Sequence, residues 1–466
     1  MKAEIITIGD EILRGEIVDS NKARIAERLL LLDVETHFQV SVRDHPEDMR
    51  HAFRTAADRA DVVVVSGGLG PTRDDRTAEV IAATFGRKLI VHGPSVAAIR
   101  RFFERAGRPM ADTNLKQAMI PEGAEVLPNP VGTAPGFTLR AGRARFFCLP
   151  GVPRELDRML EEQVLPRIEA DRAAAAGQGS GRVVRARLLR TFGIGESDLE
   201  ALVSDIARRP PAGGVEVELG FRTSFPDNLL RPVVRAPSAG EAEAALERLC
   251  RELRTRLGAL VYGEGEQTLE AVVVRELARA APPTRPGRPP AWLAVAESCT
   301  GGLLAERITS VPGASAVFRG GVVAYSNEAK RDLLGVPADL LERHGAVSDP
   351  VVRAMAAGAL GRFAADLAVA ITGISGPTGG TPEKPVGLVH IALARSGPTG
   401  TSVDTASFVF PFDRARHRRL TVQVALDWIR RALLGVDLAL PRWAPHARGG
   451  TAQPRAPAAG STGGAV

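Results

Sequence analysis

The sequence predicts an α/β protein with three folded parts: an N-terminal parallel-sheet domain, a small α+β connector and a C-terminal α/β domain. In both outer parts, short apolar runs alternate with longer amphipathic runs, an order typical of a parallel sheet covered by helices. Residues 61–66 contain four consecutive valines, the pattern of a strand buried on both faces. A proline-rich linker at 282–290 precedes the last domain.

The N-terminal domain is predicted to span residues 1–170. Ser20 is the expected N-cap of its first long helix, because a serine hydroxyl can accept a hydrogen bond from a first-turn amide. The predicted strands are at 3–8, 34–42 and 61–66, and the predicted helices are at 20–32, 46–59, 77–85 and from 154 onward.

The connector is predicted at 183–262, after an Ala- and Gly-rich surface loop at 170–182. The C-terminal domain is predicted at 291–436, and the segment at 441–466 lacks an apolar period and is expected to be disordered. Ser348 and Pro350 indicate a helix start, with Ser348 as the cap. In the connector we expect strands at 183–189, 215–222 and 230–236 and helices at 197–207 and 239–257; in the last domain we expect strands at 291–296, 321–324 and 367–371 and a helix at 303–308.

The composition indicates an enzyme of the reduced cytoplasm. Aromatic residues make up only 5% of the 466, which argues against a stacking platform for nucleic acid, and the net charge of +6 is small for this length. No apolar run approaches the ~18 residues that a membrane span requires. The three cysteines match no metal or redox spacing. We expect small-molecule substrates, a homodimer, and neither membrane nor nucleic acid as partners.

Lysine is scarce in this chain. Of 60 basic residues only six are lysines, so arginine supplies most of the positive charge. Because arginine does not lose its proton in proteins, a retained lysine is a candidate for a group that must do so. Lys116, Lys330 and Lys384 lie in Gly-, Pro- or Asn-rich motifs, although chance retention explains each of them equally well.

The first candidate site follows the valine strand. Gly67, Gly68 and Gly70 allow backbone amides to face a phosphate, and Asp74 and Asp75 are hard oxygen ligands for a divalent cation. In parallel sheets, ligands bind beyond the carboxyl ends of the strands. The alternative is a tight turn followed by an acidic helix cap. The end of the first strand is expected to face the same crevice, with Asp10 and Glu11 as further metal ligands.

These motifs resemble the molybdopterin-binding fold family, and more closely the CinA (competence/damage-inducible) family within it. The resemblance implies a metal-dependent pyrophosphatase that splits ADP-ribose into AMP and ribose 5-phosphate, with the glycine loop and Lys116 binding substrate. The matching segments are 7–11, 67–75, 114–118, 131–136 and 149–153.

The second candidate site follows the apolar run at 291–296. Ser298 is a hydroxyl nucleophile at a strand end, and Gly301 and Gly302 open a helix whose amides favour a developing oxyanion. Cys299 is the rival nucleophile, but adjacent side chains at a strand exit point in opposite directions. Lys330 is the candidate base if burial lowers its pKa. Tyr325 is an alternative proton acceptor, and the residues alone do not choose between these two.

The last domain resembles the CinA C-terminal domain, a nicotinamide mononucleotide deamidase, across nearly its whole length. The resemblance implies hydrolysis of nicotinamide mononucleotide to nicotinate mononucleotide and ammonia without a cofactor. It implies that Ser315 and Thr372 position substrate with their hydroxyls, beside Gly373, and that Arg414 clamps the phosphate. The matching segments are 296–302, 311–315, 325–330, 344–348, 372–377 and 383–387.

Two other functions stay open from the sequence. The N-terminal domain is alternatively a binding module for a nucleotide or pterin phosphate, with acids too sparse for catalysis. The family name suggests an interaction protein in competence, which predicts steeply salt-dependent DNA binding. The low aromatic content argues against the latter.

Overall fold

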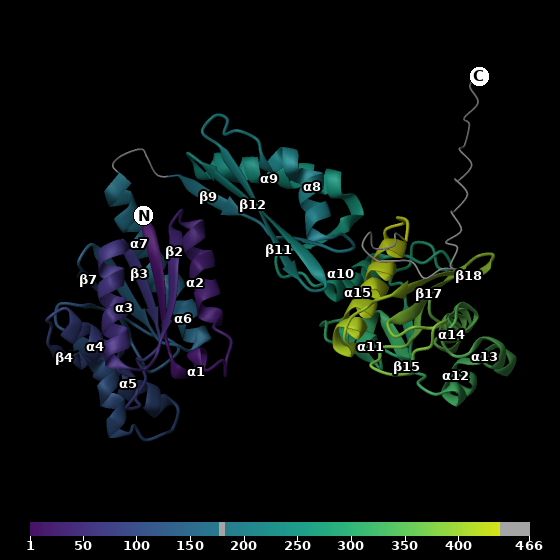
Figure 1. Cartoon of the computed structure of the whole chain (residues 1–466), viewed down its shortest axis with the longest axis horizontal. Helices are drawn as coiled ribbons and strands as arrows, with labels where there is room; N and C mark the ends of the chain where they lie inside the picture. Colours follow the sequence, from purple (N-terminus) through teal and green to yellow (C-terminus); the bar gives the residue numbers. More distant parts are fainter. Residues whose placement is uncertain (177–181, 439–466) are drawn as a thin grey trace. The chain divides into compact units, whose positions relative to one another are not determined.

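The computed structural model describes residues 1–176 and 182–438, which fall into two compact units (Figure 1). The first unit is drawn from 1–186, 210–217 and 233–247, and the second from the other described residues. Residues 177–181 of the expected loop and the expected tail at 441–466 lie outside this description. No helix within 1–176 or 182–438 is long and apolar enough to cross a bilayer.

The N-terminal sheet has six strands in the order β2-β1-β3-β8-β7-β6. The first four are mutually parallel, and β7 and β6 continue the sheet antiparallel. The strands are β1 (Lys2–Ile8), β2 (Glu35–Val42), β3 (Val62–Ser66), β6 (Glu125–Leu127), β7 (Gly136–Ala141) and β8 (Ala144–Leu149). The helices are α1 (Asp10–Leu13), α2 (Ser20–Leu31), α3 (Pro46–Arg59), α4 (Thr77–Thr84), α5 (Gly93–Arg105), α6 (Pro153–Met159) and α7 (Leu165–Ala176). A separate ribbon pairs β4 (Leu89–Val91) with β5 (Met119–Pro121).

Both faces of this sheet are covered, which explains the unbroken run of valines. Val63 and Val65 pack with α3 and α4 residues, whereas Val62 and Val64 pack with α2 and α6 residues. A central parallel strand in such a sandwich has no solvent face, so it needs no polar alternation. The carboxyl ends of β1, β3 and β8 lie side by side, because Thr7 pairs with Ser66 and Ser66 pairs with Leu149.

The middle sheet is antiparallel, with strand order β11-β12-β10-β13 and with β9 also paired to β12. The single strand expected at 183–189 is therefore wrong, because the chain breaks at Arg187 and Leu188 into two strands. The elements are β9 (Val183–Ala186), β10 (Leu189–Thr191), α8 (Glu196–Ala207), β11 (Glu216–Ser224), β12 (Asp227–Ala236), α9 (Ala239–Leu257) and β13 (Val261–Glu264).

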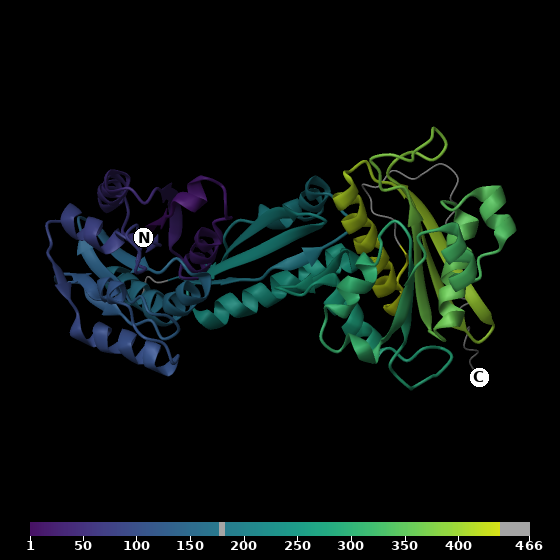
Figure 2. The same ribbon diagram turned by 90° about the horizontal axis from the view of Figure 1, so that it is seen from below.

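The C-terminal sheet has the order β15-β14-β16-β17-β18, in which β15, β14 and β16 are parallel and the last two strands are antiparallel. Figure 2 shows the yellow α15 on one face of this sheet and green helices on the other. The strands are β14 (Leu293–Glu297), β15 (Phe318–Val323), β16 (Leu367–Gly373), β17 (Leu388–Gly397) and β18 (Gly400–Val409). The helices are α10 (Leu269–Arg279), α11 (Leu303–Thr309), α12 (Asn327–Leu334), α13 (Ala338–His344), α14 (Asp349–Arg362) and α15 (Arg414–Leu433).

The two faces of β14 carry different side chains. Leu293 and Val295 pack in the cluster that contains α15 residues, and the smaller Ala294 and Ala296 pack in the cluster that contains α14 residues. Because strand side chains alternate between faces, this parity decides where the residues just beyond the strand point.

Three local expectations need correction. Residues 170–176 are helical, because α7 continues to Ala176. Asp19, one residue before Ser20, is the N-cap of α2 and accepts a hydrogen bond from the Lys22 amide. Ser348 does occupy the N-cap of α14, but its hydroxyl donates to the Gly345 carbonyl and caps no helix amide.

The proline-rich segment at 282–290 packs against the C-terminal domain. Arg285 forms an ion pair with the buried Asp366 at 2.6 Å and stacks over the Trp292 ring at 3.6 Å. Thr284 donates a hydrogen bond to the same carboxylate. The prolines of the 282–290 segment restrict its backbone conformation, and these side-chain contacts attach the segment to the C-terminal domain.

Candidate functional sites

The turn after β14 presents Ser298. Its amide donates to the Ile371 carbonyl of β16, and its carbonyl accepts from the Gly301 amide. The strand therefore continues one residue past its end before the chain turns into α11. Ser298 lies two and four positions after Ala296 and Ala294, and residues at this spacing share one face of a strand. Its side chain therefore points to the side of the sheet that carries α12 and α14.

Lys330 of α12 lies beside Ser298. Its Nζ is 3.2 Å from Ser298 Oγ and also donates to the carbonyls of Ala324 at 2.9 Å and Tyr325 at 3.2 Å. The side chain is only 1% exposed, and in the described part of the chain it pairs with no carboxylate. Burial lowers the pKa of Lys330, because the charged amine loses its hydration. This lysine is positioned to exchange a proton with the serine.

Cys299 belongs to the opposite face. It packs in the apolar cluster that contains α11 and α15 residues. Burial raises the pKa of the Cys299 thiol to about 11, so the nucleophilic thiolate is scarce at neutral pH. Both observations favour Ser298 over Cys299 as the nucleophile.

Tyr325 and Arg414 lie together at the exposed edge of the site. Arg414 Nη2 is 3.4 Å from the Tyr325 hydroxyl, and its Nη1 donates to the Gly376 carbonyl at 3.0 Å. Tyr325 is 61% exposed, and its hydroxyl contacts the guanidinium, whereas Ser298 is contacted by Lys330. This geometry favours Lys330 over Tyr325 as the proton acceptor.

The helix amides expected to form an oxyanion hole are already occupied. The Glu297 carboxylate, 1% exposed, accepts hydrogen bonds from the amides of Gly302, Leu304 and Ala305 at 2.8–3.1 Å. The Gly301 amide donates to the Ser298 carbonyl. The two glycines thus open the turn, with φ values of +56° and +91°, and do not offer free donors. Apart from its place in the motif, nothing in the sequence indicates that Glu297 would accept hydrogen bonds from these amides.

The other predicted residues of this domain have varied placements. Thr372 is fully buried and donates to the Ala346 carbonyl, and Gly373 lies in β16 against Leu388 and Val389 of β17. Ser315 is exposed on a short 3-10 helix, and among the described residues no hydrogen bond joins it to Ser298. Sequence reasoning missed Ser375, whose buried hydroxyl has no hydrogen-bond partner in the described structure.

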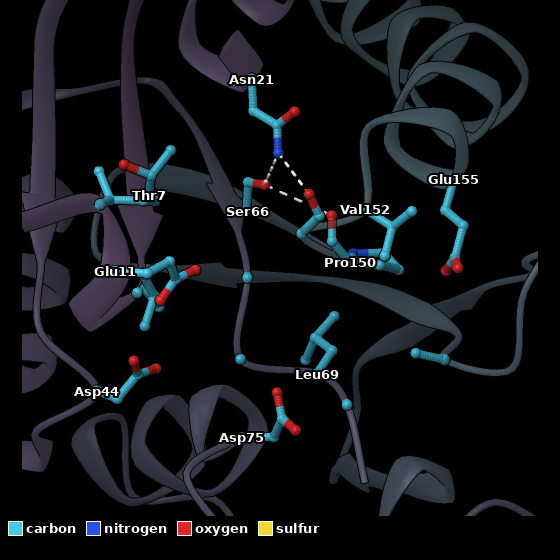
Figure 3. Close-up of a pocket in the computed structure, with 18 of the residues that line it drawn as sticks. Thr7, Glu11, Asn21, Asp44, Ser66, Leu69, Asp75, Pro150, Val152 and Glu155 are labelled. Atoms are coloured by element: carbon cyan, nitrogen blue, oxygen red, sulfur yellow. Dashed lines mark hydrogen bonds between the residues drawn. The ribbon is translucent and has the colours of Figure 1, made fainter. Parts of the chain in front are cut away.

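The N-terminal domain holds a cavity of about 590 Å³ at the carboxyl ends of its parallel strands (Figure 3). This volume suits a small-molecule ligand. Gly67, Gly68 and Gly70 line it. Gly67 has φ +109°, and a Cβ there would lie 2.3 Å from the Ile8 carbonyl oxygen, so both its backbone conformation and its packing require glycine. The predicted phosphate loop therefore borders the cavity.

The charged residues described in the lining of this cavity are all acidic. Glu11, Asp44 and Asp75 lie on one side of it, and Glu155 lies on the other (Figure 3). Burial, with the charges of nearby acids, raises the pKa of Asp44. Among the described residues that line the cavity there is no lysine, arginine or histidine, and the acidic ones are Glu11, Asp19, Asp44, Asp74, Asp75 and Glu155.

The four predicted metal ligands are only partly brought together. Glu11, Asp74 and Asp75 line the cavity, whereas Asp10 forms an ion pair with Arg14 and accepts from the Asp44 amide. Within 1–176 and 182–438, no three His, Cys, Asp or Glu side chains converge into a ligand set. The carboxylates of this cavity are nevertheless suitable ligands for a hard divalent cation. An anionic ligand would need such a cation, because no described lining residue carries a positive charge.

Lys116 holds the glycine loop from outside the cavity. Its Nζ donates to the carbonyls of Thr72 at 2.6 Å and Arg73 at 3.4 Å, and Asp75 accepts from both the amide and hydroxyl of Thr72. Lys116 lines a neighbouring hollow behind the loop and not the cavity itself. The structure therefore places Lys116 as a support of the loop, where the resemblance implied a substrate contact.

Asn21 is a cavity residue that the sequence did not single out. Its side-chain amide donates to Ser66 Oγ at 3.0 Å and to the Gly151 carbonyl at 2.8 Å, as the dashed lines of Figure 3 show for Ser66. Its carbonyl oxygen is buried without a partner. An asparagine at the start of a helix is usually a cap, so no local signal marked it.

Comparison with known proteins covers nearly the whole chain. Residues 4–170 match a family described as "Probable molybdopterin binding domain", residues 186–263 match "Damage-inducible protein CinA KH domain", and residues 289–433 match "CinA C-terminal domain". A CinA-like protein of Anaeromyxobacter sp. (strain Fw109-5) is 45% identical over 93% of this chain and 99% of its own length. One from Dictyoglomus thermophilum is 40% identical over 94% of this chain and all of its own length.

Solved structures match a smaller part of the chain. A CinA protein from Thermoplasma acidophilum is 36% identical over 36% of this chain and 96% of its own, with a TM-score of 0.33. A competence/damage-inducible protein from Agrobacterium tumefaciens is 40% identical over 36% of this chain and 93% of its own, with a TM-score of 0.32.

Proposed function

Because this chain belongs to the CinA protein family, we propose that its C-terminal domain deamidates nicotinamide mononucleotide to nicotinate mononucleotide and ammonia. The observation that carries the proposal is the 3.2 Å approach of the buried Lys330 amine to the Ser298 hydroxyl. A serine with an unpaired, desolvated lysine is an arrangement that activates a hydroxyl without histidine.

The proposed reaction proceeds in two stages. Ser298 Oγ attacks the carboxamide carbon while the neutral Lys330 amine takes its proton, and that proton passes to the leaving nitrogen, which departs as ammonia. Water then hydrolyses the acyl-serine ester, releasing the carboxylate product and restoring Ser298. The lowered pKa of Lys330 supports this role, because only the neutral amine can accept the proton.

Arg414 is proposed to bind the phosphate of the substrate. It lies with Tyr325 at the open edge of the site, and a planar guanidinium suits bidentate recognition of a phosphate. Its contacts to Gly376 and Tyr325 hold it in place and leave further N–H groups free to donate. We propose that the Tyr325 hydroxyl orients this arginine.

Two single substitutions test the nucleophile. Ser298→Ala is expected to lower ammonia release from nicotinamide mononucleotide by at least about a thousand-fold, the scale seen when a nucleophile is removed. Cys299→Ala is the matched control and should retain most activity, because the thiol packs on the other face. A Ser298→Ala protein with full deamidase activity would overturn the assignment.

For the N-terminal domain, we propose metal-dependent hydrolysis of ADP-ribose to AMP and ribose 5-phosphate. The supporting observation is a cavity lined, within the described part of the chain, by six acids and no basic residue, so a cation is needed to neutralise an entering diphosphate. Glu11, Asp44 and Asp75 are the residues that would hold the ion. When bound, a divalent cation would neutralise the diphosphate and activate it toward water.

AMP formation from ADP-ribose tests this proposal. We expect activity with added Mg²⁺ or Mn²⁺, loss with a chelator, and a loss of about 100-fold or more in Asp75→Asn. Asp48→Asn, an exposed acid outside the cavity lining, is the matched control. Binding of ADP-ribose without AMP formation at any metal concentration would favour the simple binding module, which the lack of a converged ligand set also supports.

A further inference from the structure

A second, unassigned cavity lies in the second unit. It measures about 380 Å³, and all of its lining residues belong to that unit. Its walls come from the turn between β11 and β12, the start of α10, and one side each of α11 and α15. None of the residues that contact Ser298 lines it, so it is separate from the proposed deamidase site.

Three arginines and two acids, Asp227 and Glu270, line this cavity, so its formal charge is +1 (three positive and two negative groups). Arg190 donates to the Gly265 carbonyl at 2.6 Å, and Arg307 pairs with Glu270 at 2.6 Å. Arg419 donates one Nη2 hydrogen bond to the Phe225 carbonyl at 3.0 Å. Each guanidinium has five N–H donors, so Arg307 and Arg419 retain donors beyond these contacts. Such a set suits a phosphate or carboxylate group.

The buried side chain of Gln423 also lines this cavity, and one of its two polar atoms has no partner among the described residues. Gln423 of α15 is 1% exposed, and its Nε2 donates to Asp227 Oδ1 at 2.6 Å, while its Oε1 has no partner among the described residues. The Tyr262 hydroxyl donates to the other oxygen of Asp227 at 2.6 Å. A buried carbonyl oxygen without a donor is unfavourable, and a ligand hydroxyl could supply the missing hydrogen bond.

We propose that this cavity binds a small phosphorylated sugar, with the phosphate on Arg307 and Arg419 and a sugar hydroxyl on Gln423 Oε1. The two requirements are complementary: guanidiniums need an anion, and an amide oxygen needs a donor. A free phosphate satisfies only the first, and an uncharged sugar satisfies only the second. The cavity volume accommodates a pentose phosphate and is small for a dinucleotide.

Calorimetric titration of the full chain with ribose 5-phosphate tests the proposal. We expect saturable binding that weakens by about tenfold or more in Arg419→Met, since one charge-assisted contact is lost. Arg416→Met is the matched control: Arg416 lies on the same helix, 5.7 Å from the Phe225 ring against 5.8 Å for Arg419, but does not line the cavity. Arg416→Met should bind like the wild type.

A second pair of titrations tests the hydroxyl contact. Gln423→Leu should weaken ribose 5-phosphate and leave the weaker binding of inorganic phosphate unchanged. Thermal melting of each variant confirms that it is folded. The proposal is overturned if ribose 5-phosphate fails to bind at millimolar concentration, or if Arg419→Met binds it as the wild type does. Ribose 5-phosphate is also the proposed product of the N-terminal reaction, so the difference between Arg419→Met and the wild type, and not binding alone, locates the ligand in this cavity.

Discussion

At the scale of single residues, three of the six lysines, Lys116, Lys330 and Lys384, divide into two roles. Lys116 and Lys384 donate to backbone carbonyls of neighbouring loops, those of Thr72 and His344, and so act as compact donors. Lys330 also donates to carbonyls, but it is the one of these three that reaches a hydroxyl nucleophile. Retention of lysine in an arginine-rich chain therefore indicates a need for a small ammonium group, and proton transfer is only one such need.

The pH dependence of deamidation is predicted from Lys330. Burial lowers its pKa below the ordinary value of 10.5, so the amine is deprotonated at a lower pH than a free lysine. The rate should rise with pH through the lowered pKa and then level off. Folding stability should rise with pH across the window between the lowered pKa and 10.5, because the unfolded chain binds more protons there.

Substitution of Lys330 by arginine checks the same assignment. Arginine keeps the positive charge but does not lose its proton, so Lys330→Arg should lower kcat by about 100- to 10,000-fold. Tyr325→Phe is the matched variant: it should raise KM for nicotinamide mononucleotide more than it lowers kcat, because the hydroxyl contacts Arg414. A near-normal kcat in Lys330→Arg would instead indicate that Tyr325, and not Lys330, accepts the proton of the Ser298 hydroxyl.

At the scale of elements, the N-terminus of α11 is capped from the preceding strand. The Glu297 carboxylate points toward the start of α11 and accepts hydrogen bonds from three backbone amides there. The next residue, Ser298, carries the proposed nucleophile. The anion site that a helix N-terminus offers is thus filled by the protein itself. The parity of β14 allows this, because Glu297 and Ser298 point to opposite faces.

Substitution of Glu297 by glutamine should loosen this helix start. A glutamine keeps one acceptor oxygen but places N–H donors against helix amides, at a cost of about 1–3 kcal/mol. Hydrogen exchange of the 298–309 segment should accelerate by about 5- to 150-fold, which measures that local cost. Glu306→Gln, an exposed acid in the first turn of the same helix, is the control and should exchange as the wild type does.

At the scale of the whole molecule, the two proposed active sites lie in different compact units. The acidic cavity belongs to the first unit, and Ser298 with Lys330 belongs to the second. Each site has its own core and is built from strands of its own sheet.

Independent catalysis is the expected behaviour of this arrangement. Asp75→Asn should abolish AMP formation and leave the deamidase kcat/KM within about twofold, and Ser298→Ala should do the reverse, because mutations without shared partners act additively. Ammonia and AMP measured on each variant and on the double variant give the full comparison. A Ser298→Ala protein with impaired ADP-ribose hydrolysis would reveal coupling between the units.

The sequence alone was enough to predict the fold class, the order of most elements and the identity of the Ser298 and Gly67 motifs. These depend on local information: apolar period, glycine at positive φ, and runs of residues matched to a family. It failed at 183–189 and at 170–176, where pairing and helix extension depend on neighbours. Asp10, expected from its place at the end of the first strand, and Lys116, implied by the family resemblance, do not line the cavity, because Asp10 pairs with Arg14 and Lys116 donates to the Thr72 carbonyl.

Only the tertiary structure decided which groups meet. Lys330 reaches Ser298 across 32 residues because α12 packs on the face of β14 toward which Ser298 points, and Glu297 caps α11 because it points the other way. Side-chain direction follows from strand parity, but the partner on each face follows from the order of strands and helices in space. The sequence therefore determined the chemical groups available, and the fold determined their partners and their protonation.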